Sequence, residues 1–160
     1  MTDLDTFLST SPRLRFAFMV KVKVAPMIDL GVTSVGHRRV IDILGGEVSG
    51  PRLSGEILPG GADWQVVRPD GAIQVEARYT IRAASGGLVY VRNDGVRVAS
   101  PEILAALGRG EVVAPASYYF RTSPRFETAD PALTWMQDAV FIGVATRAPT
   151  GVAIGFHEVL

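Results

Sequence analysis

The chain contains no cysteine and only two histidines, His37 and His157, among its 160 residues. Without thiols it cannot form a disulfide, a thiolate zinc site, an iron–sulfur cluster or a cysteine nucleophile. Two histidines are too few for a three-histidine metal site, and Arg38 and Arg39 would repel a cation bound at His37. The glycine-rich phosphate-binding motifs and the Gly-x-Ser-x-Gly elbow are also missing. We therefore expect neither a bound metal nor a cofactor.

The chain also has no net charge, because sixteen basic side chains balance sixteen acidic ones. A neutral chain with dispersed arginines does not suit a nucleic-acid binder, whose affinity depends on neutralising phosphates. No apolar run reaches eighteen residues, and the first twelve residues are too polar for a signal peptide. We expect a cytoplasmic protein that binds neither nucleic acid nor membrane. One imbalance remains, because fourteen of the sixteen basic residues are arginine, whose planar fork binds carboxylates.

Alternation of apolar and polar residues dominates the chain and predicts an all-β fold. In residues 72–83, apolar side chains occupy one face and polar side chains, from Gln74 to Arg82, occupy the other. The segments Pro69-Asp70-Gly71 and Asn93-Asp94-Gly95 predict turns, because proline, asparagine and glycine favour turn conformations. Strands are predicted over residues 14–24, 37–44, 52–58, 62–68, 72–83, 88–92, 96–99, 117–122, 138–147 and 151–159.

One helix is well marked over residues 101–107, where Ser100 can cap its start and Gly108 can end it. A second short turn is expected at Asp130-Pro131. Strands with hairpin spacing and seventeen glycines indicate an antiparallel sandwich or barrel. We favour a closed or nearly closed barrel, since long strands need the curvature that interior glycines allow. The whole chain is expected to form one domain, with residues 1–12 as a loose N-terminal arm.

A more specific pattern lies in the middle of the chain, where Gly45-Gly46-Glu47-Val48-Ser49-Gly50-Pro51 precedes Gly60-Gly61-Ala62-Asp63-Trp64. With Glu76-Ala77-Arg78-Tyr79, Phe126-Glu127-Thr128 and Trp135, it resembles the bacterial and fungal family called domain of unknown function 3237, or uncharacterised protein family 0311. The resemblance covers nearly the whole chain and implies a closed antiparallel β-barrel, loosely like lipocalins or allene oxide cyclases. It implies no established activity.

Asp63 and Trp64 directly follow a Gly-Gly turn, which is a suitable position for the mouth of a barrel. A carboxylate at that position can accept hydrogen bonds or act as a base, and an indole ring supplies a flat binding wall. Alternatively, Asp63 caps the turn locally and Trp64 fills the core. Asp63 is therefore a candidate catalytic residue, and Trp64 is a candidate ligand-binding residue.

Glu76 and Arg78 are the other candidate catalytic residues, because side chains two residues apart on a strand point to the same side. If that face lines the interior, the two charges must pair or bind a polar ligand. If it lies outside, the pair belongs to a solvated surface, which five successive polar positions favour. Tyr79 then lies on the opposite face, as a core residue or as a hydroxyl donor to a ligand.

Two further pairs are candidates for ligand binding. Tyr119 and Arg121 share a strand face and could hold an aromatic carboxylate by stacking and a forked salt bridge, although such a set is more often a packing ladder. Tyr90 and Arg92 share a face of their strand and could add a hydroxyl and a cation to the same cavity. An exposed edge would explain the second pair equally well.

Glu127 and Trp135 are expected in a loop over one barrel end, where Glu127 either reaches the lumen or caps a turn. The leading hypothesis is that the lumen binds a small, partly apolar molecule, aromatic or carbonyl, with an acidic group. The first alternative is a cofactor-free isomerase, dehydratase or cyclase in which Asp63 or Glu76 moves a proton and Arg78 steadies the developing anion. The second alternative is a structural barrel with a packed lumen, whose exposed strands form a homodimer.

Overall fold

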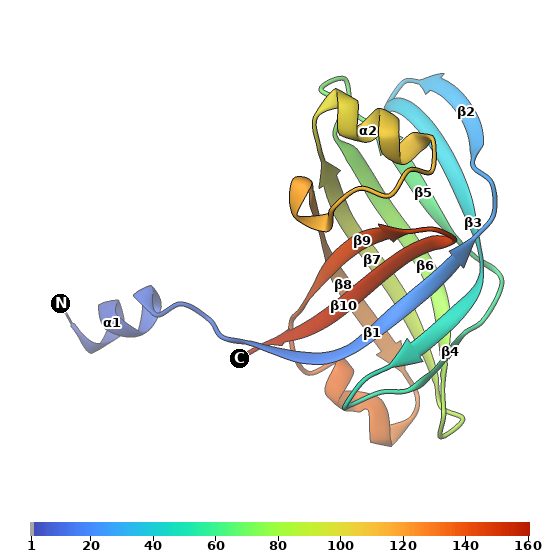
Figure 1. Ribbon diagram of the computed structural model, residues 1–160. Coiled ribbons are helices and arrows are strands. Elements are labelled where there is room, and N and C mark those ends of the chain that lie inside the picture. The colour runs from blue at the N-terminus through green and yellow to red at the C-terminus, as the bar shows by residue number, and fades with distance from the viewer. Residues whose placement is uncertain (1) are drawn as a thin grey trace.

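The structure is a computed structural model that describes residues 2–160, and it consists of an antiparallel β-barrel with short helices at its ends (Figure 1). The elements follow one another in the order α1 (Asp3–Ser9), β1 (Leu14–Val24), β2 (Ile28–Thr33), β3 (Gly36–Ser49), β4 (Gly55–Ile57), β5 (Gly61–Val67), β6 (Ile73–Ala83), β7 (Leu88–Val98), α2 (Pro101–Gly108), η1 (Pro115–Ser117), β8 (Tyr119–Thr128), η2 (Pro131–Met136), β9 (Phe141–Ala148) and β10 (Gly151–Val159).

The sheet closes on itself because β1 pairs with both β10 and β3. From β1 the order around the barrel is β10, β9, β8, β7 and β6, and then β3 after a position that β4 and β5 share. The long strand β3 makes this arrangement possible. Its first half pairs with β2 and β5, and its second half pairs with β1 and β4. The predicted all-β antiparallel barrel is confirmed.

The turn predicted at Asn93-Asp94-Gly95 is wrong, because β7 continues through these residues to Val98. Each of the three residues pairs with β6 on one side and with β8 on the other, and these two ladders outweigh the local turn preference. Gly95 fits because a Cβ there would lie only 2.4 Å from the carbonyl oxygen of Arg121. The continuous strand directs Asn93 into the barrel, where its side chain is 1% exposed.

The two ends of the barrel are covered by different helices (Figure 1). The predicted helix is confirmed as α2, which is capped by the Ser100 hydroxyl and lies over one end. The short η2 lies at the opposite end and buries Leu133 and Met136. Helix α1 extends away from the barrel and has no buried residue, so the N-terminal segment is a helix that makes little contact with the core.

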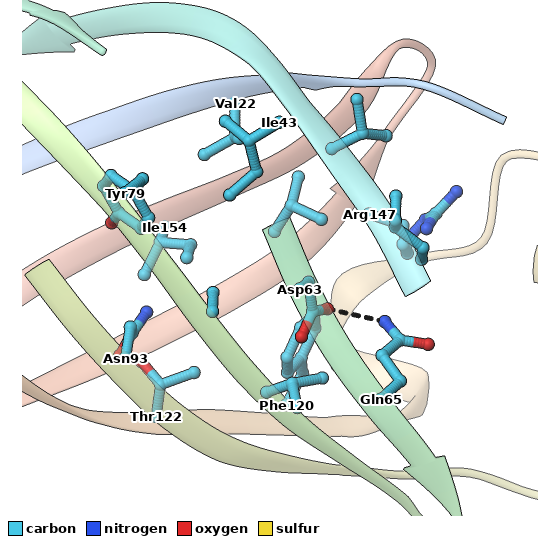
Figure 2. Close-up of a pocket in the computed structure, with 15 residues that line it drawn as sticks. Val22, Ile43, Asp63, Gln65, Tyr79, Asn93, Phe120, Thr122, Arg147 and Ile154 are labelled. Atoms are coloured by element: carbon cyan, nitrogen blue, oxygen red, sulfur yellow. Dashed lines mark hydrogen bonds between the residues drawn. The ribbon is translucent and has the colours of Figure 1, made fainter. Parts of the chain in front are cut away.

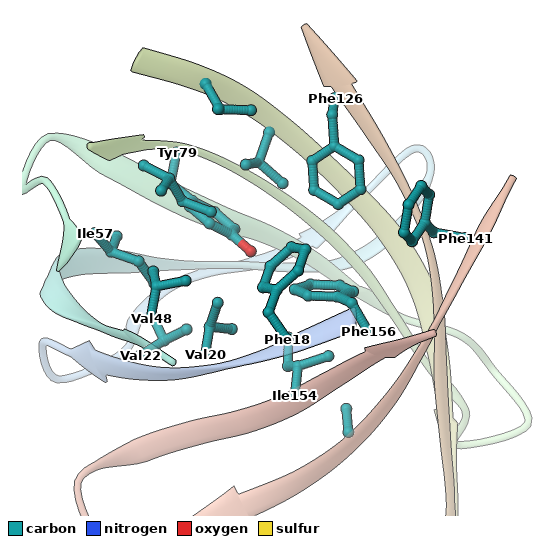
Figure 3. Close-up of a cluster of buried hydrophobic side chains, with 14 of the residues drawn as sticks. Phe18, Val20, Val22, Val48, Ile57, Tyr79, Phe126, Phe141, Ile154 and Phe156 are labelled. Atoms are coloured by element: carbon teal, nitrogen blue, oxygen red, sulfur yellow. The ribbon is translucent and has the colours of Figure 1, made fainter. Parts of the chain in front are cut away.

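The half of the barrel next to η2 is filled by aromatic side chains (Figure 3). Phe18 packs on Phe156 and Phe126, with ring centroids 5.0 and 5.9 Å apart, and Phe126 packs on Phe141 at 5.3 Å. These rings are close-packed and fill this half of the barrel. The other half, next to α2, is less completely filled.

Candidate functional site

A cavity of about 50 Å³ lies inside the half of the barrel next to α2. It shares Ile41, Gln65 and Arg147 with an outer chamber of about 320 Å³ that lies between the barrel rim and the α2 residues Leu104 and Leu107. The chamber is at the lower end of the volumes of small-molecule sites, which run from about 300 to 1,000 Å³. The shared residues place the two spaces next to each other, the wider one outside and the narrower one inside the barrel.

Asp63 and Asn93 face the inner cavity from two strands that flank β6. Both pair with Ala77 of β6, Asp63 from β5 and Asn93 from β7. Two strand spacings put their backbones about 10 Å apart. Because the intervening Ala77 carries only a methyl group, the space between the carboxylate and the amide stays open, as the two side chains in Figure 2 illustrate.

Asp63 is held by two hydrogen bonds. Its Oδ1 accepts the backbone N–H of Glu76 at 2.9 Å, and its Oδ2 accepts Nε2–H of Gln65 at 2.7 Å. Gln65 in turn accepts a 2.7 Å hydrogen bond at Oε1 from the Arg39 guanidinium. Burial raises the pKa of the Asp63 carboxyl, while these hydrogen bonds and the charges of Arg97 and Arg39 oppose the rise.

Three arginines, Arg39, Arg97 and Arg147, line the outer chamber from β3, β7 and β9. In residues 2–160, none of the three has a carboxylate within ion-pair distance. Arg97 is only 6% exposed, and burial together with repulsion from Arg147 and Arg39 lowers its pKa to about 10. Burial likewise lowers the pKa of Arg39, whose Nε is buried without a partner. The chamber therefore carries positive charge that Asp63 balances only in part.

Several polar atoms inside the barrel have no hydrogen-bond partner. They are the hydroxyl of Tyr79, Oδ1 of Asn93 and Oγ1 of Thr122, and all three residues line the inner cavity. Thr122 occupies its position because Gly143 lies beside it, where a Cβ would be 2.0 Å from the Thr122 hydroxyl. Buried polar atoms are nearly always hydrogen-bonded in folded proteins, so the unpartnered atoms of Asn93 and Thr122 indicate space for a polar ligand or water.

Of the predicted site residues, Asp63 and Tyr79 line the cavity. The expectation that Glu76 and Arg78 face the lumen is wrong. They form a 2.8 Å ion pair on the outer surface, where their side chains are 38% and 49% exposed. The reason is strand parity, because Val75, Ala77 and Tyr79 point inward and the two residues between them must point outward.

The remaining candidates also lie away from the cavity. Trp135 covers the opposite end of the barrel, where the Arg52 guanidinium stacks on its ring at 3.8 Å. Glu127 lies in β8 rather than in a loop. The expectation that the other candidates line the lumen is wrong. The following residues lie on the outer face of their strands: Trp64, Tyr90, Arg92, Tyr119, Arg121 and Glu127.

The sequence reasoning missed the cluster that does line the pocket. Gln65 could have been found, since it lies two residues after Asp63 on the same strand. Arg97 was missed because the turn predicted at Asn93-Asp94-Gly95 interrupted the strand before it. Once β7 is continuous, the inward parity of Val89 and Val91 continues to Asn93 and Arg97. Arg147 follows the inward parity of β9 in the same way, and Arg39 that of β3.

Two other kinds of site find no support in residues 2–160. No group of three or more histidine, aspartate or glutamate side chains there could hold a metal ion. Within the same residues, no helix is both long and apolar enough to cross a membrane.

Comparison with known proteins agrees with the fold. The sequence model of a family described as protein of unknown function (DUF3237) matches residues 12–159. A UPF0311 protein of Rhodopseudomonas palustris is 42% identical over 146 residues, which cover 91% of this chain and 95% of the relative.

Solved structures give the same result. A conserved protein of unknown function from Rhodopseudomonas palustris superposes with a TM-score of 0.90 at 41% identity, covering 95% of this chain and 99% of that one. A beta-barrel like protein from Acinetobacter baumannii gives a TM-score of 0.77 at 35% identity, with coverage of 95% and 99%. The resemblance noted from the sequence motifs is confirmed.

Proposed function

We propose that this chain, which belongs to the DUF3237 family of proteins of unknown function, binds a small, partly apolar carboxylate in its barrel lumen. The observation that supports the proposal is the cluster of Arg39, Arg97 and Arg147 at the outer chamber, which has no carboxylate within ion-pair distance in residues 2–160. Keeping guanidinium groups half or fully buried without a counter-ion is unfavourable. A ligand carboxylate would relieve that cost and form charge-assisted, forked hydrogen bonds.

The rest of the pocket favours an apolar body on this carboxylate. Most residues around the inner cavity are aliphatic or aromatic, including Val22, Ile43, Phe120 and Ile154 (Figure 2). The few polar residues among them include Asp63, Gln65 and Asn93. Sites for small organic molecules have this composition, with an apolar wall and a few polar groups that set orientation.

The test compares phenylacetate with phenylacetamide, which have the same shape but differ in charge. We expect phenylacetate to raise the melting temperature and to bind in isothermal titration, and the amide to do neither. Substituting Arg97→Met or Arg147→Met should weaken phenylacetate binding by about 10- to 100-fold, since a hydrogen bond to a charged group contributes about 1.5–3 kcal/mol.

Arg125→Met is the matched control, because Arg125 is exposed on β8 and does not line the pocket. This variant should bind phenylacetate like the wild type. The proposal is refuted if the acid and the amide bind equally, or if Arg97→Met and Arg147→Met both bind phenylacetate as tightly as Arg125→Met does.

A further inference from the structure

We propose that Asp63 is a catalytic residue that moves a proton between carbon atoms of a carbonyl acid bound in the lumen, so that the barrel is a cofactor-free isomerase. The inference rests on the proposed function, since the arginine cluster must hold the carboxylate of the substrate. It extends that function from binding to a reaction and assigns the reacting part of the molecule to the inner cavity.

The position of Asp63 suits a base. Its carboxylate lines the inner cavity next to Ala77 and is fixed by the Glu76 N–H and the Gln65 amide. Each carboxylate oxygen accepts one of these hydrogen bonds, so each keeps a second lone pair. No arginine is paired with it within 4 Å in residues 2–160, and so the base is not neutralised by a salt bridge.

The groups around the rest of the cavity suit the charge that would develop. The Thr122 hydroxyl is buried without a partner, and Thr122 lines the same cavity. A hydroxyl can donate to the carbonyl oxygen of a substrate, and the hydrogen bond strengthens as that oxygen becomes an enolate. Asn93, whose backbone lies about 10 Å from that of Asp63, lines the opposite side of the cavity. The cavity of about 50 Å³ therefore suits a small group, such as a carbonyl and its adjacent carbon.

The arginines set the direction in which the substrate enters. Arg97 lies four residues from Asn93 on β7, so its backbone is about 13 Å nearer the outer chamber. A carboxylate held at the guanidinium tips therefore leaves the carbonyl end pointing toward Asp63. Burial in the cavity raises the pKa of Asp63, which makes its carboxylate a stronger base near neutral pH.

The reaction needs no further reactant. An Asp63 oxygen takes a proton from the carbon next to the carbonyl, and the C–H electron pair becomes the C=C bond of an enolate. The carbonyl π electrons move to the oxygen, where a hydroxyl donates a hydrogen bond. The Asp63 carboxylic acid then returns the proton, either to the same carbon or to a conjugated one. The second outcome shifts a double bond, and both outcomes regenerate the carboxylate.

The experiment uses two aromatic carbonyl acids, phenylpyruvate and 4-oxo-4-phenylbutanoate, dissolved with the protein in D₂O. Proton NMR measures deuterium uptake at the carbon next to each carbonyl. We expect the wild type to accelerate uptake above the buffer rate for at least one probe. Asp63→Asn should lower the enzymatic rate by about 100-fold or more, which is the ordinary contribution of a general base. The same variant should still bind the probe, as judged by its rise in melting temperature.

A pH profile on the wild type provides a test that does not depend on the folding of a variant. The uptake rate should rise with pH through a single ionisation, that of Asp63. The other titratable or charged groups facing this carboxylate are Arg39, Arg97, Arg147 and Tyr79, and the Arg97 pKa of about 10 lies well above the tested range of about pH 4–8.

The outcomes separate the two proposals. If a probe binds but uptake equals the buffer rate or is unchanged in Asp63→Asn, proton transfer is refuted and carboxylate binding stands. An uptake rate that does not change with pH refutes proton transfer by Asp63 as well. If neither probe nor phenylacetate binds the wild type, both proposals fail.

Discussion

Replacing Arg97 by methionine should make the protein more stable while it weakens ligand binding. Arg97 is 6% exposed, and in residues 2–160 it has no ion-pair partner. Methionine has a similar length and no charge. The folded protein therefore loses an unfavourable charge without gaining a large cavity.

The size of the effect follows from the pKa of Arg97, which burial and the neighbouring arginines lower from 12.5 to about 10. At 1.36 kcal/mol for each pKa unit, the charged guanidinium costs the folded state roughly 3 kcal/mol. For a base with a lowered pKa, this cost is fully present below pH 10, where the group is charged in both states. Loss of the cation–π contact with Phe120, 5.5 Å away, offsets about 1 kcal/mol. A net gain of about 2 kcal/mol should raise the melting temperature by about 4–8 °C in a chain of this size.

Differential scanning calorimetry and urea unfolding at pH 7 measure this gain, with Arg125→Met as the exposed control that should change stability by less than about 0.5 kcal/mol. Phenylacetate at one fixed concentration should then stabilise the wild type and Arg125→Met more than it stabilises Arg97→Met. A lower melting temperature in Arg97→Met than in the wild type would refute the reasoning, since it would mean that the folded state satisfies this charge.

Three smaller changes test other parts of the pocket. Tyr79→Phe removes a buried hydroxyl that has no partner, so the free energy of unfolding should stay constant or rise by up to about 1 kcal/mol. A clear decrease of this free energy in urea unfolding would contradict the prediction. Gly143→Ala puts a Cβ 2.0 Å from the Thr122 hydroxyl and should destabilise the protein by about 1–3 kcal/mol, whereas the double variant with Thr122→Ala should recover part of that loss. Because burial raises the pKa of Asp63 above 3.8, folding favours its protonated form. The stability of the wild type relative to Asp63→Asn should therefore fall as pH rises through that pKa. Urea unfolding at a series of acid pH values measures the difference between the two midpoints, and a difference that rises or stays constant with pH would refute this prediction.

The strand pattern could be predicted from the sequence because alternation is a local property. The predicted range of β1 agrees with the structure, and β6 and β10 agree to within one residue. Asp63 and Tyr79 were named as candidates from their residue types and neighbours, and both line the cavity.

The inward face of each strand was decided only by the tertiary structure. Local alternation in Val96-Arg97-Val98 favours an exposed arginine, but the continuous ladder with β6 and β8 keeps the parity set by Val89 and Val91 and turns Arg97 inward. The same pairing of strands places Glu76 and Arg78 on the outer surface of the barrel. Alternation in the sequence therefore determined that this chain is all-β, and strand length and glycines favoured a barrel over a sandwich. The register of strands far apart in the chain decided which charges face the lumen, because one residue of shift moves every side chain to the other side of the sheet.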